Sequence, residues 1–549
     1  MADEPHDRRV IPLFGDAPAG APLTDLAGRP RGSERLKAVL AQKNPAAVVA
    51  AMPIQDLYYL VHEVGLSDAQ ELVELATPEQ LQGMIDLDAW QGDHFDTALF
   101  RPWLGALVEA GHEKLTSVWR ELDPELTALL IQRWTRIYNI VEEELPEDEE
   151  PPFFPTPDRF FMVKITAEDD GDVRLVERLL DWLYRGDAAQ ARHTLRQAAS
   201  EPTAELEEMS YRWRAGRLAD LGYAAYDEAL EVYRPIDPAS IKTDEASQET
   251  PLDTQRLPAP LAGPAVGTGF LAKVLARITD AGEASRLETA LVMLLNRVLA
   301  ADRVPPGDTT AAVAGSARAA ATLSLGLETM ARGDVDRGVA TLARVSLTRL
   351  HRLGHTVTLQ LGRLLAALGA RAARLDEPYA SIATALRGSR PSYARLLDDP
   401  PEAGTRPIAT LEDLRRATLA LTRVAAQTVL VHEILHVDPI QRGDAVTLGD
   451  VGRTAVAHAL LTGELSTEPL RLAHVVALAE QLPGGIPSAQ SREKIARAFG
   501  QAAAAKKIPL PPEWAAVVDG WIADLGRGVL QRGHQVVLDR RFVEGLLVE

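Results

Sequence analysis

The dominant pattern along the chain is an apolar stripe at helical spacing, interrupted by short polar or proline-containing breaks. From Ser33 onward, leucine, valine and alanine recur every three or four residues, which is the period of one helix face. Between about 53 and 140 the predicted helices are short, and several open with a capping sequence, such as Thr-Pro-Glu-Gln at 77–80 or Asp-Pro-Glu at 123–125. Short amphipathic helices cannot bury their stripes alone, so we expect them to stack on their neighbours.

This pattern predicts an all-α protein with two superhelical, α-solenoid-like domains. Alternating apolar residues at 158–165 predict at most a minor short strand or hairpin. The regular alternation of strands and helices that a dinucleotide-binding fold needs is missing.

Proline-rich and acidic stretches divide the chain. Residues 1–32 hold five prolines and no lasting apolar period, so we expect a disordered arm. An N-terminal helical domain is predicted at 33–234, with an acidic loop at 141–152 that is either a solvated linker or a docking patch for a basic partner. Residues 235–267 are rich in proline and predict an interdomain linker, and 268–549 form the predicted C-terminal helical domain.

Charge and composition exclude several classes of function. The 58 basic and 78 acidic side chains give a net charge of −20, which would repel phosphates, so we expect neither nucleic-acid binding nor attraction to an anionic membrane. The absence of cysteine excludes disulfides, thiolate zinc sites and cysteine nucleophiles. Neither an apolar run long enough for membrane insertion nor a signal-peptide pattern is found, so we expect a cytoplasmic protein.

One motif carries chemistry. His432, Glu433 and His436 form His-Glu-x-x-His, which locally resembles the zinc-metalloprotease motif. On an α-helix the two histidines would lie on one face and bind one Zn²⁺, and Glu433 would act as general base on a zinc-bound water. The third ligand would come from one of four downstream side chains: His458, Glu464, Glu468 or His474.

The same residues also fit an ordinary buried helix. Residues 410–436 predict one long amphipathic helix, and His432 adjoins its apolar stripe, where a hydrogen-bonded core histidine is common. No strand that would align a substrate is predicted nearby, and Asp438-Pro439 ends the helix at once. Without a bound metal, the motif is a coincidence of a helical core.

A second cluster lies at 206–222, where Arg212, Arg214 and Arg217 fall within two helical turns. Glutamates and an aspartate at helical spacing predict a salt-bridged helix. The alternative is a binding site for an anion or an acidic peptide, built on the planar forks of the three guanidinium groups.

Residues 206–222, together with Asp-Leu-Tyr-Tyr-Leu at 56–60 and Ile-Asp-Leu-Asp-Ala-Trp at 85–90, resemble the signature of an uncharacterised bacterial family of large helical proteins. That resemblance implies no activity. Residues 67–134 are also similar to the cytosolic helical N-domain of MgtE-type magnesium transporters, and this likeness implies a helical fold only.

Two functions remain as hypotheses. The first is a non-catalytic cytoplasmic scaffold or adaptor, without a cofactor, that binds an unknown protein partner through helical-repeat-like surfaces. The alternative is a zinc-dependent, peptidase-like hydrolase that uses His432, Glu433 and His436.

Overall fold

The structure is a computed structural model of the 549-residue chain. It describes residues 32–141, 153–167, 169–241, 259–267, 269–305, 308–442, 445–482, 485–527, 529–532, 535–538 and 545–548. The chain divides into two compact units, residues 1–353 and 354–549, at a point inside helix α18 (Leu347–Ala367). Each unit is described here by itself.

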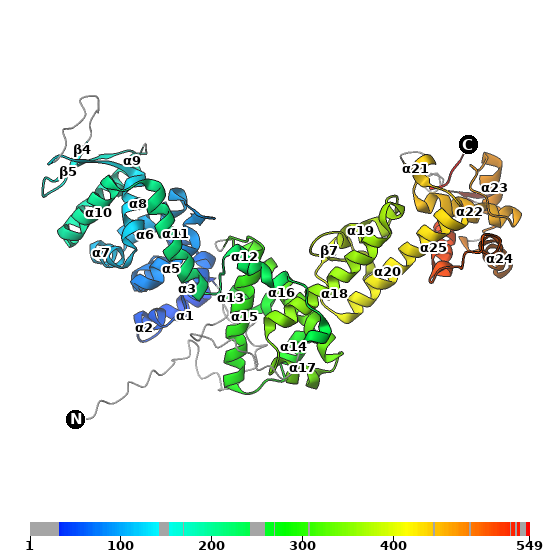
Figure 1. The fold of residues 1–549 in the computed structure, drawn as a ribbon, viewed down its shortest axis with the longest axis horizontal. Helices are drawn as coiled ribbons and strands as arrows, with labels where there is room; N and C mark the ends of the chain where they lie inside the picture. The colour runs from blue at the N-terminus through cyan, green and yellow to red at the C-terminus, as the bar shows by residue number, and fades with distance from the viewer. Residues whose placement is uncertain are drawn as a thin grey trace. The chain divides into compact units, whose positions relative to one another are not determined.

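Unit 1 is built from short and medium-length helices (Figure 1). Its α-helices are α1 (Gly32–Leu40), α2 (Pro45–Ala50), α3 (Ile54–Val64), α4 (Gln70–Leu75), α5 (Pro78–Asp88), α6 (Thr97–Glu109), α7 (His112–Glu121), α8 (Pro124–Trp134), α9 (Asp170–Gly186), α10 (Ala188–Ser200), α11 (Thr203–Asp220), α12 (Tyr226–Ala229), α13 (Ala259–Val266), α14 (Phe270–Leu275), α15 (Ala281–Ala301), α16 (Thr309–Ala331), α17 (Val335–Leu342) and the start of α18.

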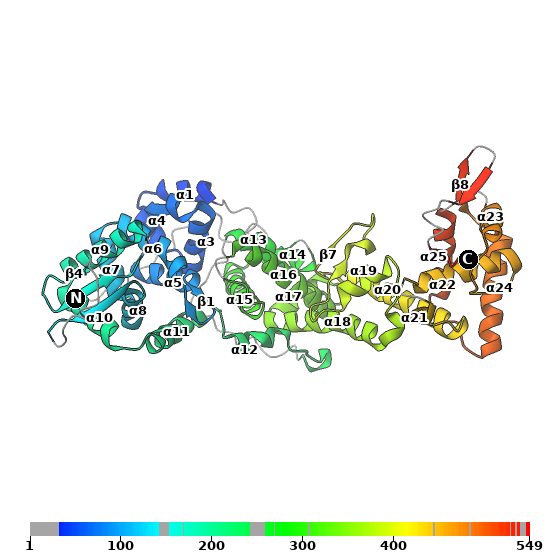
Figure 2. The same cartoon turned by 90° about the horizontal axis from the view of Figure 1, so that it is seen from above.

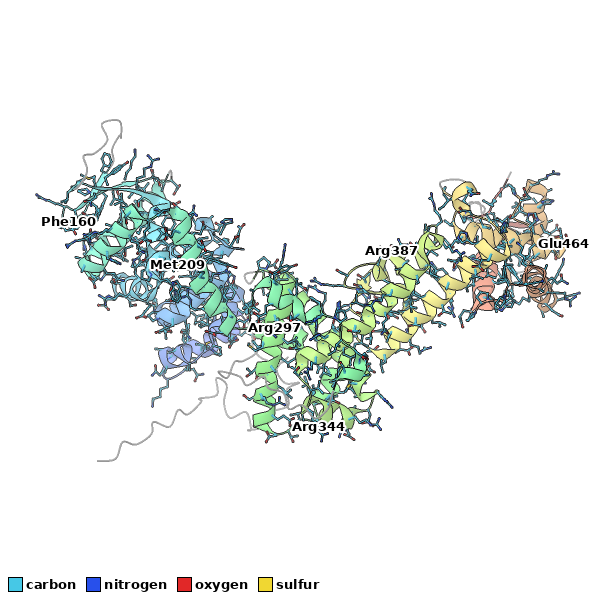
Figure 3. All side chains as sticks on the ribbon, in the orientation of Figure 1. Phe160, Met209, Arg297, Arg344, Arg387 and Glu464 are labelled. Carbon is cyan, nitrogen blue, oxygen red and sulfur yellow. The ribbon has the colours of Figure 1, made fainter. Side chains whose placement is uncertain are left out.

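Two small antiparallel sheets accompany the helices of unit 1. Strands β1 (Trp90–Gln91) and β2 (His94–Phe95) form a hairpin after α5. Strands β3 (Thr135–Asn139), β4 (Phe153–Pro155) and β5 (Phe161–Ile165) form a sheet in the order β3-β5-β4, with Ile137 opposite Val163 and Phe154 also opposite Val163. Phe160, labelled in Figure 3, precedes β5 and lies under the guanidinium of Arg192.

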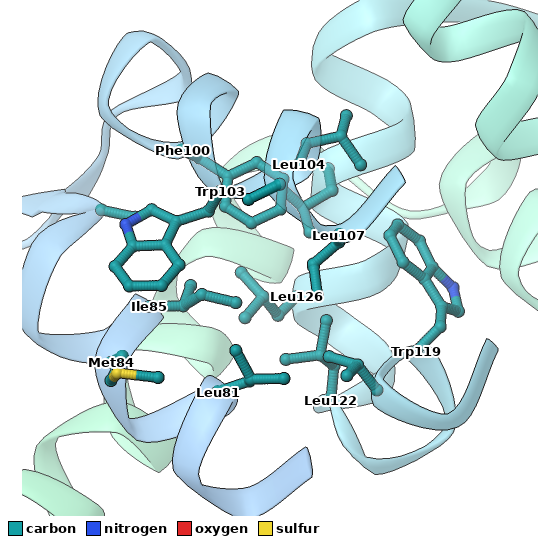
Figure 4. Close-up of a cluster of buried hydrophobic side chains, with 14 of the residues drawn as sticks. Leu81, Met84, Ile85, Phe100, Trp103, Leu104, Leu107, Trp119, Leu122 and Leu126 are labelled. Carbon is teal, nitrogen blue, oxygen red and sulfur yellow. The ribbon is translucent and has the colours of Figure 1, made fainter. Parts of the chain in front are cut away.

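The core of unit 1 forms where the apolar stripes of α5 to α8 meet. Figure 4 shows Trp103 and Trp119 on opposite sides of a group of leucines that includes Leu81 and Leu107. Both indole rings are at most 2% exposed, so truncating either to alanine is expected to cost about 3 to 5 kcal/mol. The capping box predicted at 77–80 is confirmed, because Thr77 accepts from the Gln80 backbone and Gln80 accepts from the Thr77 backbone.

Unit 2 is also mainly helical and contains two two-stranded antiparallel sheets (Figures 1 and 2). Its elements are the rest of α18, α19 (Tyr379–Leu386), β6 (Tyr393–Ala394), β7 (Thr405–Arg406), α20 (Leu411–Val429), the π-helix η7 (Leu430–Ile434), α21 (Pro439–Arg442), α22 (Leu448–Thr462), α23 (Leu472–Glu480), α24 (Ala489–Lys506), α25 (Trp514–Arg527), β8 (Val529–Arg532) and β9 (Gln535–Leu538).

Helices α22 and α25 pack closely in the core of unit 2. A Cβ atom on Gly452 of α22 would lie 2.3 Å from the ring of Trp521 in α25, so only glycine fits there without a shift of the helices. Beside this contact the buried guanidinium of Arg453 donates to the carboxylates of Asp376, Asp450 and Asp524. This ion cluster joins α22 and α25 to the segment that precedes α19.

The all-α prediction is confirmed, whereas the solenoid-like arrangement of helices stays a prediction. Strand β5 confirms the strand expected at 158–165, but the sequence analysis missed β3, because it extended the preceding helix to about 140. Among the described residues no helix is long and apolar enough to cross a membrane.

The predicted domain limits meet the structure only in part. Of the predicted arm, only Gly32 is among the described residues, and of the acidic loop only Val141. Residues 242–258 of the predicted linker also lie outside the described residues. Its last part forms α13, which packs against α16 and α3. The division by contacts falls at 353/354, and the boundary at 235–267 stays a prediction.

Candidate functional site

Helix α11 carries the arginine cluster that the sequence analysis identified. Its buried residues are Leu206, Ser210, Arg214 and Leu218, which follow each other at intervals of four and therefore form one stripe. Arg214 thus occupies a core position of the helix, and a buried guanidinium is tolerated only when its donors are satisfied.

Partners from the segment 86–92 satisfy Arg214. Its Nε donates to the carbonyl oxygen of Asp86 at 2.7 Å, and one terminal nitrogen donates to the carbonyl oxygen of Gly92 at 3.3 Å. The guanidinium also lies 5.2 Å from the ring centroid of Trp90, a distance within cation–π range. Burial lowers the pKa of Arg214 to about 10, which keeps the side chain charged at neutral pH.

Arg217 joins two further helices through four charge-assisted hydrogen bonds. It donates to the carboxylate of Asp86 in α5 at 2.6 and 3.1 Å, and to the carboxylate of Asp123 before α8 at 3.0 and 2.7 Å. Desolvation opposes its charge, but the bonds to both aspartates outweigh this effect and raise the pKa of Arg217. The Asp86 side chain is only 1% exposed, and its burial raises its pKa although Arg217 favours the ionised form.

The pairing with Arg217 changes the role that Asp123 was expected to play. The sequence pattern predicts a side-chain cap at the start of α8, and Asp123 does stand at the N-cap position. Its carboxylate makes no capping hydrogen bond, because it accepts from Arg217 instead. The start of α8 is therefore fixed by α11 rather than by its own cap.

Arg212 differs from the other two arginines. It forms an i,i+4 ion pair with Glu208, as the helical spacing predicts, and both side chains are more than 60% exposed. The structure therefore separates the predicted cluster: Arg214 and Arg217 point into unit 1, and Arg212 faces solvent. The donors of Arg214 and Arg217 described above are used within the protein, and an anion site on all three forks stays a prediction.

Of the other two stretches of the predicted signature, 85–90 contacts α11 through Asp86, and 56–60 contacts 85–90. Asp88, at the end of α5, accepts hydrogen bonds from the Tyr58 hydroxyl at 3.1 Å and from the Trp103 indole at 2.7 Å. Burial opposes the charge of Asp88, but its bonds to His62, Trp103 and Tyr58 prevail and lower its pKa. Segments 85–90 and 206–222 thus meet at one polar junction, which we call the arginine junction and define by Asp86, Asp123, Arg214 and Arg217. Segment 56–60 is linked to 85–90 through Tyr58 and Asp88.

A buried amide pair extends this region to α15. Gln55 of α3 and Asn296 of α15 exchange two hydrogen bonds of 2.8 Å, and Gln55 also donates to the Tyr223 hydroxyl at 3.0 Å. Tyr223 directly follows the turn that ends α11. The junction and the amide pair together fix α11 against α3, α5, α8 and α15.

The His-Glu-x-x-His motif lies where α20 ends. The helix starts after Thr410, close to the predicted position, with a capping box formed by Thr410 and Asp413, but it becomes the π-helix η7 at Leu430. His436 lies beyond the last helical residue with a φ of 60°, so the i,i+4 argument for a shared helix face does not apply.

Arg371 contacts two residues of this motif, Glu433 and His432. It forms an ion pair with Glu433 at 2.7 Å, and its carbonyl oxygen lies 3.2 Å from the Nε2 atom of His432. A general base on a zinc-bound water would need the carboxylate that this ion pair engages.

The four candidate third ligands do not complete a metal site. His458 contacts the carbonyl oxygen of Glu468 through Nε2 at 2.9 Å, and His474 accepts from the backbone of Arg471. The carboxylate of Glu464 belongs to no cluster either, since within the described part of the chain no three His, Cys, Asp or Glu side chains are grouped to hold a metal ion.

The protein is all-α, and most of the polar side chains described above form hydrogen bonds or ion pairs within the chain. The chain belongs to the Family of unknown function (DUF6178), whose family model matches residues 22–549. Searches of curated proteins and of solved structures find no match. The resemblance seen at 206–222 is thereby confirmed as a family relationship, while the likeness to the MgtE N-domain stays a prediction.

Sequence reasoning identified the arginines but missed their partners Asp86 and Asp123. It considered only acids within one helical turn, and that rule holds for Arg212 and Glu208. A signal for the buried pair was present, because Arg214 continues the interval of four set by Leu206 and Ser210. A charged residue at a core position calls for partners on other helices.

Proposed function

We propose that this protein is a non-catalytic cytoplasmic scaffold or adaptor, and that helix α11 forms part of the surface that binds another protein. The observation that carries the proposal is Trp213, which is 53% exposed although it lies between the engaged residues Arg212 and Arg214. Large aromatic side chains, tryptophan above all, are enriched among the anchors of protein interfaces.

The exposed part of Trp213 is large enough to contribute to binding. A tryptophan side chain can bury up to about 250 Å², so roughly 130 Å² remains for a partner to cover, worth about 3 kcal/mol. Met209, labelled in Figure 3, lies one helical turn earlier on the same side of α11 and is half-buried.

The arginine junction supports the proposal because it holds α11 in one rotational setting. The four bonds of Arg217 and those of Arg214 fix the buried face of the helix. Trp213 precedes Arg217 by four residues and lies at the exposed edge of this face, so it is presented without further ordering, which lowers the entropic cost of binding. The zinc-hydrolase alternative has less support, because Glu433 is engaged by Arg371.

Photo-crosslinking in the cells that make the protein tests this proposal. A photoreactive amino acid replaces Gly216, which lies three residues after Trp213 and whose Cβ position is open. Gly520 in α25, another exposed helical glycine with an open Cβ position, is the matched control. We expect a discrete protein adduct at 216 that disappears with Trp213→Ala and is absent at 520. An adduct that is equal at both positions, or that survives Trp213→Ala, contradicts the proposal.

A further inference from the structure

Two consecutive helices of unit 1 expose apolar side chains to solvent. Trp213 on α11 is followed by Tyr226 and Leu230 at α12, which are 39% and 37% exposed. Figure 2 shows α12 following α11 along one edge of unit 1. We call the exposed residues of 205–234 the α11–α12 surface.

Acidic side chains outnumber basic ones within the segment 205–234, and one arginine from outside the segment, Arg303, lies over the ring of Tyr226. Two exposed arginines, Arg212 and Arg234, lie in this segment, and each is paired with a glutamate of the same helix region. The exposed acids are Glu205, Glu208, Asp220, Asp227, Glu228 and Glu231. Six acids against two arginines leave a net charge of −4 on the exposed part of this segment.

A surface that combines aromatic rings with carboxylates is complementary to the long cationic side chains of lysine and arginine. Lysine and arginine place their aliphatic stems along apolar surface while their charged heads reach carboxylates. The structure already contains one such contact, because the guanidinium of Arg303 lies 4.1 Å from the ring centroid of Tyr226. An acidic segment would be repelled here, and so would a second copy of this chain, which carries a net charge of −20.

We infer that the α11–α12 surface binds a basic, amphipathic segment of a partner protein, with Trp213 as the apolar anchor and Asp227 and Glu228 as charged contacts. This inference rests on the proposed function and adds the chemistry of the partner. Leucine-type residues of the partner segment cover Trp213, and its lysines and arginines pair with the acids.

A defined probe tests the inference on the full-length purified protein. The probe is a fluorescent amphipathic peptide of leucine and lysine at helical spacing, and a peptide with glutamate in place of lysine is the negative probe. Because the whole chain is acidic, the double variant Asp227→Asn/Glu228→Gln is compared with Asp68→Asn/Glu71→Gln. The second pair lies on an exposed part of unit 1 and changes the net charge by the same amount.

Fluorescence anisotropy gives the affinity of each variant, and circular dichroism confirms that each is folded. We expect Trp213→Ala to weaken binding of the lysine peptide about tenfold if the peptide covers half of the exposed ring, and about 100-fold if it covers all of it. Asp227→Asn/Glu228→Gln should weaken it about threefold to fivefold, with a smaller salt dependence, and the control pair should leave it unchanged.

Equal losses for the two double variants would mean that the peptide binds the overall charge, and this result overturns the inference. Tight binding of the glutamate peptide overturns it as well. If the crosslink at 216 forms but the double variant at 227 and 228 leaves the adduct unchanged, the scaffold proposal stands and the basic-partner inference fails.

Discussion

Replacing Arg217 by methionine removes the centre of the arginine junction while it keeps an unbranched side chain of similar length. The carboxylate of Asp86, 1% exposed, then loses both of its bonds to Arg217, whereas Asp123, 15% exposed, is open to some water. An unpaired buried charge typically costs 3 to 5 kcal/mol, and the partial exposure of Arg217 and Asp123 places our estimate at about 3 kcal/mol.

Hydrogen exchange of the full-length protein measures this loss where it occurs. A loss of about 3 kcal/mol accelerates exchange about 100-fold for amides that exchange by opening of the junction. Peptides that cover α5 and α11 should show this acceleration. Arg212→Met is the matched control on the same helix, and its exposed ion pair predicts an effect below about 1 kcal/mol.

A second variant tests whether the unpaired carboxylate of Asp86 causes the loss of stability. If the cost comes from the unpaired carboxylate, Asp86→Asn in the Arg217→Met background restores part of the protection. An Arg217→Met effect no larger than that of Arg212→Met, or the absence of any rescue by Asp86→Asn, would refute the reasoning.

Four further predictions concern single positions. Gly452→Ala should destabilise unit 2 by about 1 to 3 kcal/mol through its clash with Trp521, while Gly216→Ala should stabilise α11 by about 0.5 to 1 kcal/mol, both by urea unfolding. Burial and a neighbouring arginine lower the pKa of His355 to about 4. Between about pH 6.5 and 4, His355 is protonated in the unfolded chain but not in the folded one. The free energy of unfolding should therefore fall by at most about 3 kcal/mol as the pH is lowered through that range. The variant His355→Gln should flatten this pH dependence. Elemental analysis should find zinc far below one per chain in the wild type and in His432→Ala.

Each of these predictions has a clear opposite result. A stable Gly452→Ala protein would mean that the two helices move apart at little cost. An unchanged pH profile in His355→Gln would assign the acid sensitivity to other groups. Near-stoichiometric zinc that is lost in His432→Ala would favour the hydrolase over the scaffold.

The helices were predictable because their determinants are local. The capping box of α5 and the apolar stripe of α20 depend on residues close together in the sequence, and the structure confirms them. Strand β3 was not predictable in this way. Its five residues follow α8 directly, and their extended conformation depends on pairing with β5, from Thr135 opposite Ile165 to Asn139 opposite Phe161.

The candidate sites show the same division between local and distant causes. The pair of Arg212 and Glu208 follows from helical spacing, but the partners of Arg217 come from residues 86 and 123, which no periodicity connects to α11. The His-Glu-x-x-His motif failed as a guide to geometry because its argument assumes an α-helix. The chain instead adopts a π-helix at 430–434 and leaves the helix before His436.

The long separation of the junction partners has a consequence for synthesis of the chain. Arg217 follows Asp86 by 131 residues, and Asn296 follows Gln55 by 241. At about 5 to 20 residues per second, a ribosome needs roughly 7 to 26 s to add Arg217 after Asp86, and roughly 12 to 48 s to add Asn296 after Gln55. During that interval the N-terminal helices leave the ribosome without the hydrogen bonds that fix them. A chain truncated within 235–267 lacks Asn296 altogether. We therefore expect the nascent N-terminal helices to require protection from aggregation until α15 has been made.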